Sequence, residues 1–386
     1  MIRPLTLALL VSLVACSGSP PPADETHASE SPSYVDIVEE QSGAFASMID
    51  ATMASLQVPG GYVGIVGPEG LVFSRAYGTE TISEDTPFSA KSRARLASAT
   101  KVLTSLVFYS LAEDGLMPLD ATLGSLDPEL PAAWQRITIA QILNHTSGLP
   151  PIVYRDDFNA MSGEEQLALT EEDLFSLISS SGLDFEPGED WRYQQSGYML
   201  LAAVARSVTG KSWDQLLAER VFEPAGLRHT SYTSPETQAA AYEVVSGEFV
   251  PKTGYYPKPM SMGGGYDTTG EDMQRLFEAL NNGAIVSNSF LLNDVLKDDR
   301  LHQFGSNVAG EGYGPATVVE RYETGKSIGH SGGGGLANIR YSPEAEIGII
   351  VLTNRTGGTN VAAEITLAIE EALFGAALKA EAPADP

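Results

Sequence analysis

The most restrictive feature of the sequence is the placement of its strand-like segments at both ends of the chain. Residues 61–78 alternate around a Pro-Glu-Gly turn and predict two strands. Strand-like segments return at 316–325, 336–343 and 346–355. The segments between them are mostly helical, without a regular alternation of strand and helix, and a last helix is expected at about 360–374. We therefore expect an α/β (α+β) fold. Its largely antiparallel sheet is built from both chain ends and flanked by helices, with a mainly helical insertion at about 141–305.

The N-terminus has the pattern of a targeting segment. Arg3 precedes a short apolar run at 5–14, which is too short to span a bilayer comfortably and ends in Leu-Val-Ala-Cys at Cys16. This tetrad resembles the bacterial lipoprotein signal, in which the lipidated cysteine becomes the first residue and its acyl chains anchor the protein. We therefore predict a signal peptide over residues 1–15 and a lipid anchor at Cys16. Ser17 favours the outer membrane, facing the periplasm of the cell envelope.

Composition limits the remaining organisation. Residues 16–40 are rich in Ser, Pro, Ala and acids and predict a flexible tether, whereas an apolar fraction of 43% supports a sizeable core elsewhere. We expect the folded domain at 41–376 and a disordered tail at 377–386. A net charge of −27 argues against nucleic acid as a partner, because a phosphate backbone requires a basic face. Cys16 is the only cysteine, so no intrachain disulfide can form, and nothing indicates an obligate protein partner.

Ser98 stands three residues before Lys101, at the start of an apolar segment that predicts a buried helix ending near Gly115. Residues at i and i+3 share a face of a helix, so the Ser98 hydroxyl and the Lys101 amine can meet. A serine needs a base to act as a nucleophile, and a buried lysine with a lowered pKa can supply one. The positive end of the helix would also favour a developing oxyanion. Among the lysines, only Lys101 has a serine at this spacing.

Five segments follow one another in a recognisable order. They are ASATKVLTSL (97–106), ILNHTSGLP (142–150), FEPGEDWRYQQSGYMLLAAV (185–204), MGGGYDTTGEDM (262–273) and GHSGGGG (329–335). Together they resemble the serine β-lactamase-related family, which includes class C β-lactamases, penicillin-binding DD-peptidases and carboxylesterases of the same fold. The resemblance covers about residues 45–375 and implies a β-lactamase/DD-peptidase-like fold.

The resemblance implies a catalytic role for three side chains. Ser98 corresponds to the nucleophile that becomes acylated, and Lys101 to the lysine that helps to remove its proton. Tyr193, in WRYQQSGY, corresponds to the tyrosine that works as a base and then donates a proton to the leaving group. This chemistry is sound, because neighbouring ammonium groups lower the pKa of a phenol and the phenol can return the proton.

The segment HSG, His330–Gly332, corresponds to a motif that is Lys-Thr-Gly in many members and His-x-Gly in others. The resemblance implies that this strand edges the site and that His330 faces it as a polar or cationic group. It also implies that the N–H groups of Ser98 and Gly333 form the oxyanion hole. His145, in NHTSG, is expected to be a structural loop residue that holds backbone groups.

Two positions depart from the family pattern. The second motif is commonly Tyr-x-Asn, but it reads Tyr-Gln-Gln at Tyr193–Gln195, and the added methylene displaces the amide by about one bond length. The third motif has His330 where many members have lysine, and histidine is a weaker partner for a carboxylate at neutral pH. Both changes weaken the case for a dedicated β-lactamase. The candidate substrate-binding and oxyanion residues are Gln195, His330, Gly332 and Gly333.

Other chemistries have weaker signals. The segment GHSGG at 329–333 matches the nucleophile elbow Gly-x-Ser-x-Gly, which would make Ser331 the nucleophile. That arrangement needs a later histidine and a following helix, whereas His330 is the last histidine and strand-like sequence follows it. The histidines show no metal-ligand spacing, and the glycine run lacks the ending of a phosphate loop. We therefore predict neither a metal nor a cofactor.

The sequence thus predicts a serine hydrolase that acts through an acyl-enzyme on a small ester, a D-amino-acid peptide or a β-lactam. The alternative is a catalytically weak cell-envelope protein of the same fold, which binds cell-wall peptide or another envelope protein. The altered second motif slightly favours the alternative, whereas the presence of Ser98, Lys101 and Tyr193 together argues against it. The reactivity of Ser98 distinguishes the two.

Overall fold

The computed structural model describes residues 33–376, apart from 235–236, 255–256, 298–300, 304–311 and 358–359. The predicted signal peptide, the lipidation site Cys16, the first part of the tether and the tail 377–386 lie outside the described residues. Among the helices of the described part, none is both long and apolar enough to cross a membrane.

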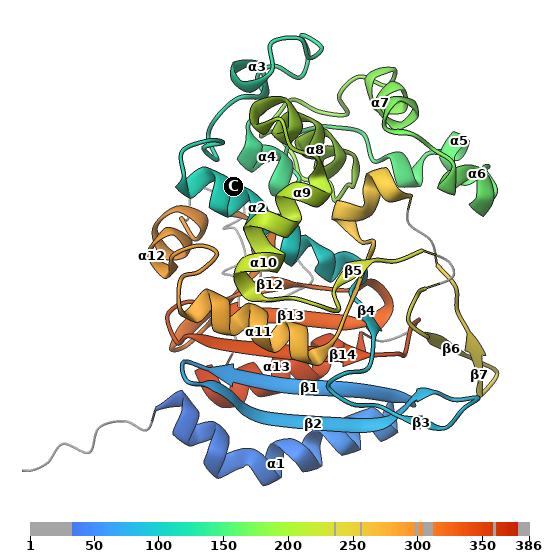
Figure 1. Cartoon of the computed structure of the whole chain (residues 1–386), viewed down its shortest axis with the longest axis vertical. Coiled ribbons are helices and arrows are strands. Elements are labelled where there is room, and N and C mark those ends of the chain that lie inside the picture. Colours follow the sequence, from blue (N-terminus) through green and yellow to red (C-terminus); the bar gives the residue numbers. More distant parts are fainter. Residues whose placement is uncertain are drawn as a thin grey trace, which may run out of the picture. The chain divides into compact units, whose positions relative to one another are not determined.

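One antiparallel sheet organises the described residues (Figure 1). Its strands are β1 (Gly60–Gly67), β2 (Gly70–Thr81), β3 (Thr86–Pro87), β9 (His302–Gln303), β10 (Gly312–Gly314), β11 (Thr317–Tyr322), β12 (Gly325–Ser331), β13 (Ala337–Ser342) and β14 (Ile347–Thr353). They are ordered β3-β2-β1-β14-β13-β12-β11-β10-β9. Strand β1 pairs with β14, with Tyr62 opposite Leu352, so segments far apart in sequence adjoin at the centre. The predicted antiparallel sheet from both chain ends is confirmed.

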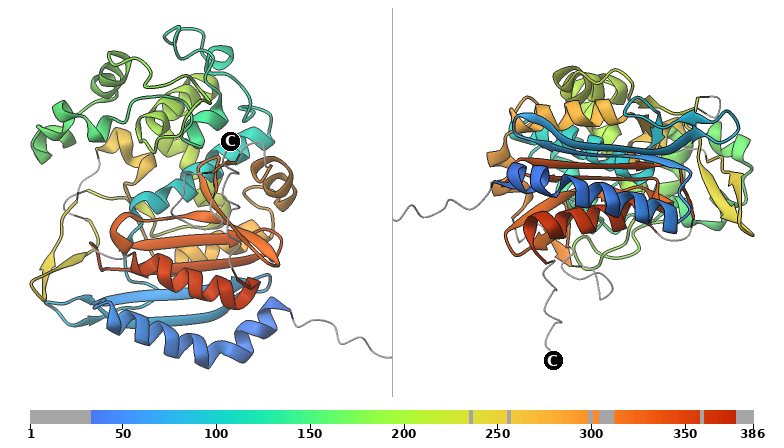
Figure 2. Two further views of the ribbon diagram at one scale, coloured as in Figure 1. Left: turned by 180° about the vertical axis from the view of Figure 1, so that it is seen from behind. Right: turned by 90° about the horizontal axis from the view of Figure 1, so that it is seen from below.

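Two helices cover one face of the sheet, α1 (Tyr34–Ser55) and α13 (Val361–Phe374). Figure 2 shows them side by side. Successive side chains of a strand point to opposite faces, and Val63 and Ile65 of β1 accordingly pack into the core beneath these helices. The last helix agrees with the helix that the sequence predicts at the end of the domain.

The opposite face is covered by α2 (Thr100–Glu113) and α11 (Gly270–Asn281). Tyr62 and Val66 of β1 alternate with the residues above and belong to this second core. Because helices pack on both faces, every residue of β1 and of β14 is buried. Helix α2 lies between the sheet and the helical region, and almost all of its residues are buried as well. A lysine on its first turn is therefore held deep inside the protein.

Helix α1 begins earlier than the sequence analysis expects. Tyr34 lies in the segment 16–40 that was predicted to be a tether, so the folded domain starts before residue 41. The reason is a capping box: the Ser33 hydroxyl accepts from the Asp36 N–H, and the Asp36 carboxylate accepts from the Ser33 N–H. The capping box lies in a polar segment whose composition does not indicate a helix.

The region between α2 and α11 is mainly helical, as predicted. Its elements are α3 (Leu123–Leu126), α4 (Ile139–Leu143), α5 (Asp156–Asn159), α6 (Gly163–Leu167), α7 (Glu171–Ser179), α8 (Ser196–Thr209), α9 (Trp213–Leu217) and α10 (Glu223–Ala225), with the short helices η2 (Ile152–Tyr154), η3 (Ala218–Phe222) and η4 (Lys258–Gly263). After α11 the chain forms α12 (Asn288–Phe290) and η5 (Leu291–Val295).

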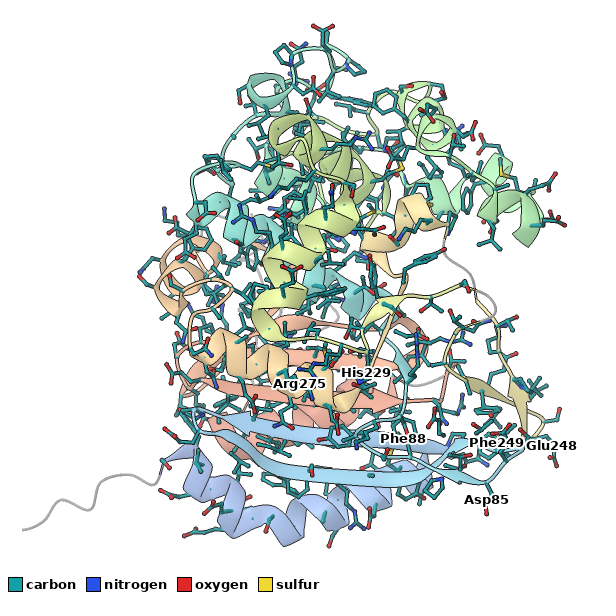
Figure 3. The ribbon with its side chains drawn as sticks, viewed as in Figure 1. Asp85, Phe88, His229, Glu248, Phe249 and Arg275 are labelled. Atoms are coloured by element: carbon teal, nitrogen blue, oxygen red, sulfur yellow. The ribbon has the colours of Figure 1, made fainter. Side chains whose placement is uncertain are left out.

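Short strands interrupt this region. The strands β4 (Ala94–Arg95), β8 (Tyr266–Thr268) and β5 (Ser231–Tyr232) form one small sheet, and β6 (Tyr242–Val245) and β7 (Glu248–Pro251) form a hairpin. Figure 3 shows Glu248 and Phe249 at the outer end of that hairpin.

A buried carboxylate on α11 holds the small sheet in place. Asp272 accepts hydrogen bonds from the His229 N–H (2.7 Å), the Thr230 hydroxyl (2.8 Å) and the Arg275 guanidinium (3.0 Å). His229 and Arg275 are labelled in Figure 3. Because β5 follows Thr230 directly and pairs with β8, this carboxylate fixes the position of β8 as well. Strand β8 in turn pairs with β4, which leads to Ser98.

Candidate active site

Ser98 lies in a short 3₁₀ helix, η1 (Ala97–Ala99), between β4 and α2. Ala97 has a φ of +44°, a left-handed conformation that costs a non-glycine residue about 1 to 3 kcal/mol. The surrounding structure overcomes this cost, since Arg95 on one side pairs with Asp267 of β8 and α2 begins on the other. Strain of this kind concentrates at functional sites and here adjoins the predicted nucleophile.

A cavity of about 340 Å³ opens in front of Ser98. Gly333 lines it as well, so the two predicted oxyanion donors share one cavity. Its charged groups are already engaged: Arg95 donates to the Ala239 carbonyl (2.7 Å), and the Asp267 carboxylate accepts from the Ala239 N–H (2.6 Å). Burial raises the pKa of Asp267. The lining also includes Ala97, Gly264, Gly265, Tyr266 and Leu336.

Lys101 is fully buried on the first turn of α2. Its Nζ donates to the Gln195 amide oxygen (2.9 Å) and to the Gly263 carbonyl (2.7 Å), which are both neutral acceptors. It also lies over the rings of Tyr193 and Tyr198, 4.8 and 5.0 Å from their centroids. Burial lowers the pKa of Lys101 well below its ordinary value. The neutral amine required of a general base is therefore favoured at this position.

The second predicted motif meets Lys101 from the segment that leads into α8. Tyr193 is half-buried, and Gln195 occupies the residue before the first turn of α8 and is 5% exposed. The added methylene of Gln195, expected to displace the amide, still allows its oxygen to reach Lys101. The structure therefore brings Lys101, Tyr193 and Gln195 together.

The third motif approaches Ser98 at the end of β12. A Cβ atom on Gly332 would lie 2.4 Å from the Leu96 carbonyl oxygen, so only glycine allows the strand to come this close to the segment that carries Ser98. The Gly332 N–H donates to the Ala337 carbonyl (2.7 Å), which fixes the turn that follows. Gly333 faces open space at the cavity.

His330 is buried rather than open to the site, with 5% of its surface exposed. Its Nδ1 lies 2.7 Å from the Ser331 carbonyl oxygen, and its Nε2 lies 3.0 Å from the Tyr313 hydroxyl. Burial, with a smaller contribution from the Lys101 charge, lowers the pKa of His330 to about 3. Of the polar and cationic alternatives in the sequence analysis, only the neutral ring fits this environment.

Two residues of the cluster around Lys101 and His330 were not predicted from the sequence. Tyr313 of β10 contacts His330 and carried no motif signal. The Gly263 carbonyl accepts from Lys101, and a Cβ at this position would overlap the Gln195 amide. Its signal was the glycine run of MGGGYDTTGEDM, which had no assigned role. His145, predicted to hold backbone groups, accepts a hydrogen bond at Nδ1 from the Gln194 N–H (3.4 Å).

The alternatives to this site gain no support. After Ser331 the chain turns through η7 (Gly333–Gly335) into β13, whereas a nucleophile elbow leads into a helix. Within the residues that the structure describes, no group of three His, Cys, Asp or Glu side chains is placed to hold a metal ion.

A serine hydroxyl at a cavity, a desolvated amine on the helix that follows and a phenol beside that amine are the groups of a serine hydrolase that uses lysine and tyrosine as bases. The chain belongs to the Beta-lactamase family, whose profile matches residues 45–374. It is thus a serine hydrolase of this family by fold and by the groups that the fold assembles.

Individual relatives differ in what their names describe. Penicillin-binding protein 4* of Bacillus subtilis (strain 168) is 28% identical over 327 residues, which cover 79% of this chain and 70% of the relative. D-amino acid amidase from Ochrobactrum anthropi SV3 has a similar structure, with a TM-score of 0.71 at 20% identity over 86% of this chain and 98% of the amidase. EstCE1, a hydrolase with promiscuous acyltransferase activity, has a TM-score of 0.70 at 21% identity over 88% and 100%. The two structural likenesses establish the fold alone.

Proposed function

We propose that this protein hydrolyses a small ester or amide through a covalent intermediate on Ser98. The observation that carries the proposal is the burial of Lys101 between neutral acceptors, one turn from the Ser98 hydroxyl. A desolvated lysine loses its proton readily and can then take the proton of the serine as that hydroxyl attacks the carbonyl carbon. The new bond joins Ser98 Oγ to the acyl carbon, and the carbonyl oxygen becomes an oxyanion.

The remaining steps use the groups around the cavity. The N–H groups of Ser98 and Gly333 stabilise the oxyanion, which collapses to expel the leaving group. Tyr193 returns the proton to that oxygen or nitrogen, since its ring contacts the amine that exchanges protons with Ser98. A water molecule then attacks the ester of Ser98 with the same groups acting in reverse. Acid and regenerated serine are the products.

Three classes of acyl donor are candidates: small esters, D-amino-acid amides or peptides, and β-lactams. The relatives support this set, because their names describe a penicillin-binding protein, a D-amino acid amidase and a hydrolase with acyltransferase activity. A cavity of about 340 Å³ lies at the lower end of the range for small-molecule sites and favours a compact acyl group.

Covalent labelling tests the proposal. The purified full chain is incubated with a fluorophosphonate and, separately, with a fluorescent penicillin, and its intact mass is followed over time. We expect a fluorophosphonate adduct in the wild type and in Ser331→Ala, and none in Ser98→Ala. No adduct in a folded wild type would overturn the proposal and favour the catalytically weak binding protein. An adduct on Ser331 would instead revive the nucleophile elbow.

The penicillin reaction divides the substrate classes. A stable penicillin adduct at Ser98 would favour a peptidase-like site, because deacylation is then slow. A fluorophosphonate adduct without a penicillin adduct would favour an esterase or a fast β-lactamase, which a β-lactam hydrolysis assay separates.

We also propose that acyl groups on Cys16 anchor the protein to the cell envelope. The support is the sequence pattern at residues 1–17. Labelling of the full chain in a bacterial host with radioactive palmitate should mark the wild type and not Cys16→Ser, and the label should sediment with membranes. Equal labelling of the two chains, or of neither, would contradict the anchor.

A further inference from the structure

Tyr313 places one hydroxyl between two buried histidines. Its Oη lies 3.1 Å from His145 Nε2 and 3.0 Å from His330 Nε2. All three side chains are at least 95% buried. His145 belongs to the helical region and His330 to the sheet, so the hydroxyl bridges the two sides of the site.

The partners of His330 determine where its ring carries a proton. Nδ1 faces the Ser331 carbonyl at 2.7 Å, and a carbonyl can only accept, so Nδ1 must carry the hydrogen. In the neutral ring Nε2 then has a lone pair and needs a donor. The Tyr313 hydroxyl at 3.0 Å supplies it.

The partners of His145 lead to the opposite tautomer. Its Nδ1 accepts from the Gln194 N–H at 3.4 Å, so the hydrogen of the neutral ring is on Nε2. That Nε2–H donates to the Tyr313 oxygen, whose own hydrogen is directed to His330. The Tyr313 oxygen has two lone pairs, so it can accept from His145 and from its further partner Tyr198 while it donates to His330.

The charges around the two rings agree with their neutrality. Burial lowers the pKa of both rings, and Lys101 lowers it further when its amine is protonated. Arg340 acts in the same direction on His330, and His330 does so on His145, whereas the hydrogen bond to the Ser331 carbonyl raises the pKa of His330. The other titratable side chains whose rings contact them are Tyr193 and Tyr313 for both, and Tyr198 for His145.

We propose that Tyr313 is a positioning residue that holds His330 as the neutral Nδ1–H tautomer at the edge of the site. The hydrogen-bond chain runs from the Gln194 N–H through His145, Tyr313 and His330 to the Ser331 carbonyl. Both nitrogens of His330 are hydrogen-bonded within the protein. The ring is therefore held neutral in one orientation and provides no cation for a substrate carboxylate.

The hydrogen-bond chain also sets the distance between the second motif, Tyr193–Gln195, and the third motif, His330–Gly332. Gln194 lies between Tyr193 and Gln195, and its N–H is held by the ring of His145, whose centroid lies 4.5 Å from that of the Tyr193 ring at an interplanar angle of 51°. The His330 ring lies 6.1 Å from the Tyr193 ring on strand β12. The effect on the reaction rests on the proposed function, whereas the tautomers of the rings do not.

Nuclear magnetic resonance of the full chain with ¹⁵N-labelled histidine tests the proposal directly. His145→Gln and His330→Gln assign the two signals among the five histidines. We expect a protonated Nδ1 in His330, a protonated Nε2 in His145, and no titration of either ring between pH 5.5 and 8. A proton on Nε2 of His330, or titration of this ring near its ordinary pKa in the wild type, would overturn the proposal.

Tyr313→Phe tests the role in the reaction. Without the donor, the neutral ring of His330 loses the hydrogen bond at its Nε2, so the pKa of His330 should rise while burial still lowers it. The acidic limb of the kcat/KM profile should move to higher pH accordingly. Because orientation is lost while binding contacts remain, kcat should fall about tenfold with KM nearly unchanged. Measurements use an ester that labels and turns over in the wild type.

Tyr109→Phe is the matched control, because this buried hydroxyl donates to the Pro315 carbonyl, next to β10, and touches neither histidine. It should keep the wild-type tautomers and pH profile, even if its stability falls. If Tyr313→Phe matches Tyr109→Phe in both readouts, Tyr313 has only a structural role. A failure of fluorophosphonate labelling would reject the proposed function while leaving the tautomers measurable.

Discussion

Strand β12 contributes residues to two buried polar clusters, one that favours neutral groups and one that surrounds a permanent cation. Alternate residues of a strand point to opposite faces, so His330 faces α2 and the active-site cluster, whereas Ser327 faces α13 and a second cluster. In the active-site cluster the basic groups are Lys101, His145 and His330, and burial drives all three towards their neutral forms. No carboxylate balances the lysine among its hydrogen-bond partners.

The second cluster, which we call the sheet cluster, is built around Arg340 of β13. Its guanidinium donates to the Ser327 hydroxyl and carbonyl and to the Val318 carbonyl (3.0 Å), and it pairs with Glu320 and Glu370 at 3.4 Å each. Arg340 is 2% exposed and Glu370 is fully buried. Arginine keeps its charge at any relevant pH, so the protein surrounds it with acceptors.

The hydrogen-bond distances in the sheet cluster require one of its carboxyl groups to be protonated. The Tyr322 hydroxyl lies 2.6 Å from a carboxyl oxygen of Glu320 and 2.6 Å from one of Glu370. A hydroxyl can donate to only one of them, so the other carboxyl must carry a proton. Glu370 is the more buried of the two and burial raises its pKa to about 8, so we assign the proton to Glu370.

The two clusters show that a buried ionisable group can either stabilise the fold or be prepared for proton transfer. A permanent charge with a full set of acceptors stabilises one arrangement of strands, because removing any partner leaves an uncompensated group. An amine without a counter-ion is destabilised as a cation and is ready to lose its proton. The same strand joins both clusters, so substitutions can test each separately.

Replacement of Lys101 should give the largest effect. Lys101→Met removes the base, and we expect kcat/KM for an activated ester to fall about 10³-fold or more. The pKa of Lys101 is lowered on folding, so the unfolded chain binds its proton more tightly, and wild-type stability rises with pH towards the ordinary lysine value of 10.5. The melting temperature of the wild type relative to Lys101→Met should therefore increase from pH 6 to pH 9. A constant difference would contradict a neutral Lys101.

Replacement of Arg340 should instead act on stability. Arg340→Met leaves the buried Glu370 and the partly exposed Glu320 without their cation, and we expect a loss of about 3 to 5 kcal/mol in the free energy of unfolding, measured with urea. The folded fraction should keep its kcat/KM to within about threefold, because Arg340 does not touch the cavity. Lost activity with unchanged stability would remove the distinction between the clusters.

Substitutions of glycine in β12 and just after it test whether the close approach of this strand to Ser98 matters for activity. Gly332→Ala places a Cβ against the Leu96 carbonyl, which should push the strand from Ser98 and lower kcat/KM about 10- to 100-fold. Gly325→Ala is the matched control on the same strand, because a Cβ at that position makes only an ordinary contact, 3.5 Å from the Glu344 carboxylate. Similar activities for the two variants would show that the strand is free to shift.

Replacement of Glu370 should give the smallest effect. Its pKa is raised on folding, so its contribution to stability is present below the ordinary carboxyl value and is lost as the pH rises through about 8. Glu370→Gln keeps a neutral hydrogen-bonding group, and the wild type should lose stability relative to this variant between pH 5 and pH 8. Thermal melts at the two pH values measure the difference. The opposite trend would show that Glu370 is ionised beside Arg340.

Much of the fold was predictable, because its signals are local. The hairpin at residues 61–78, the helix after Ser98 and the final helix follow from side-chain periodicity and turn residues over short segments. The start of α1 was not predictable from composition, since it depends on one capping box at Ser33. The placement of Ser98 and Gly333 at one cavity followed from resemblance to a family rather than from any local rule.

By itself, the sequence determined the architecture of the sheet and the residue types available for acyl transfer. Only the tertiary structure decided their ionisation states and partners. Lys101 is an ordinary lysine until the helical region and Gly263 exclude water from it, and Tyr313 reaches His145 across 168 positions. Burial and hydrogen-bond geometry set a proton's location, and both arise from segments that meet only when the chain has folded.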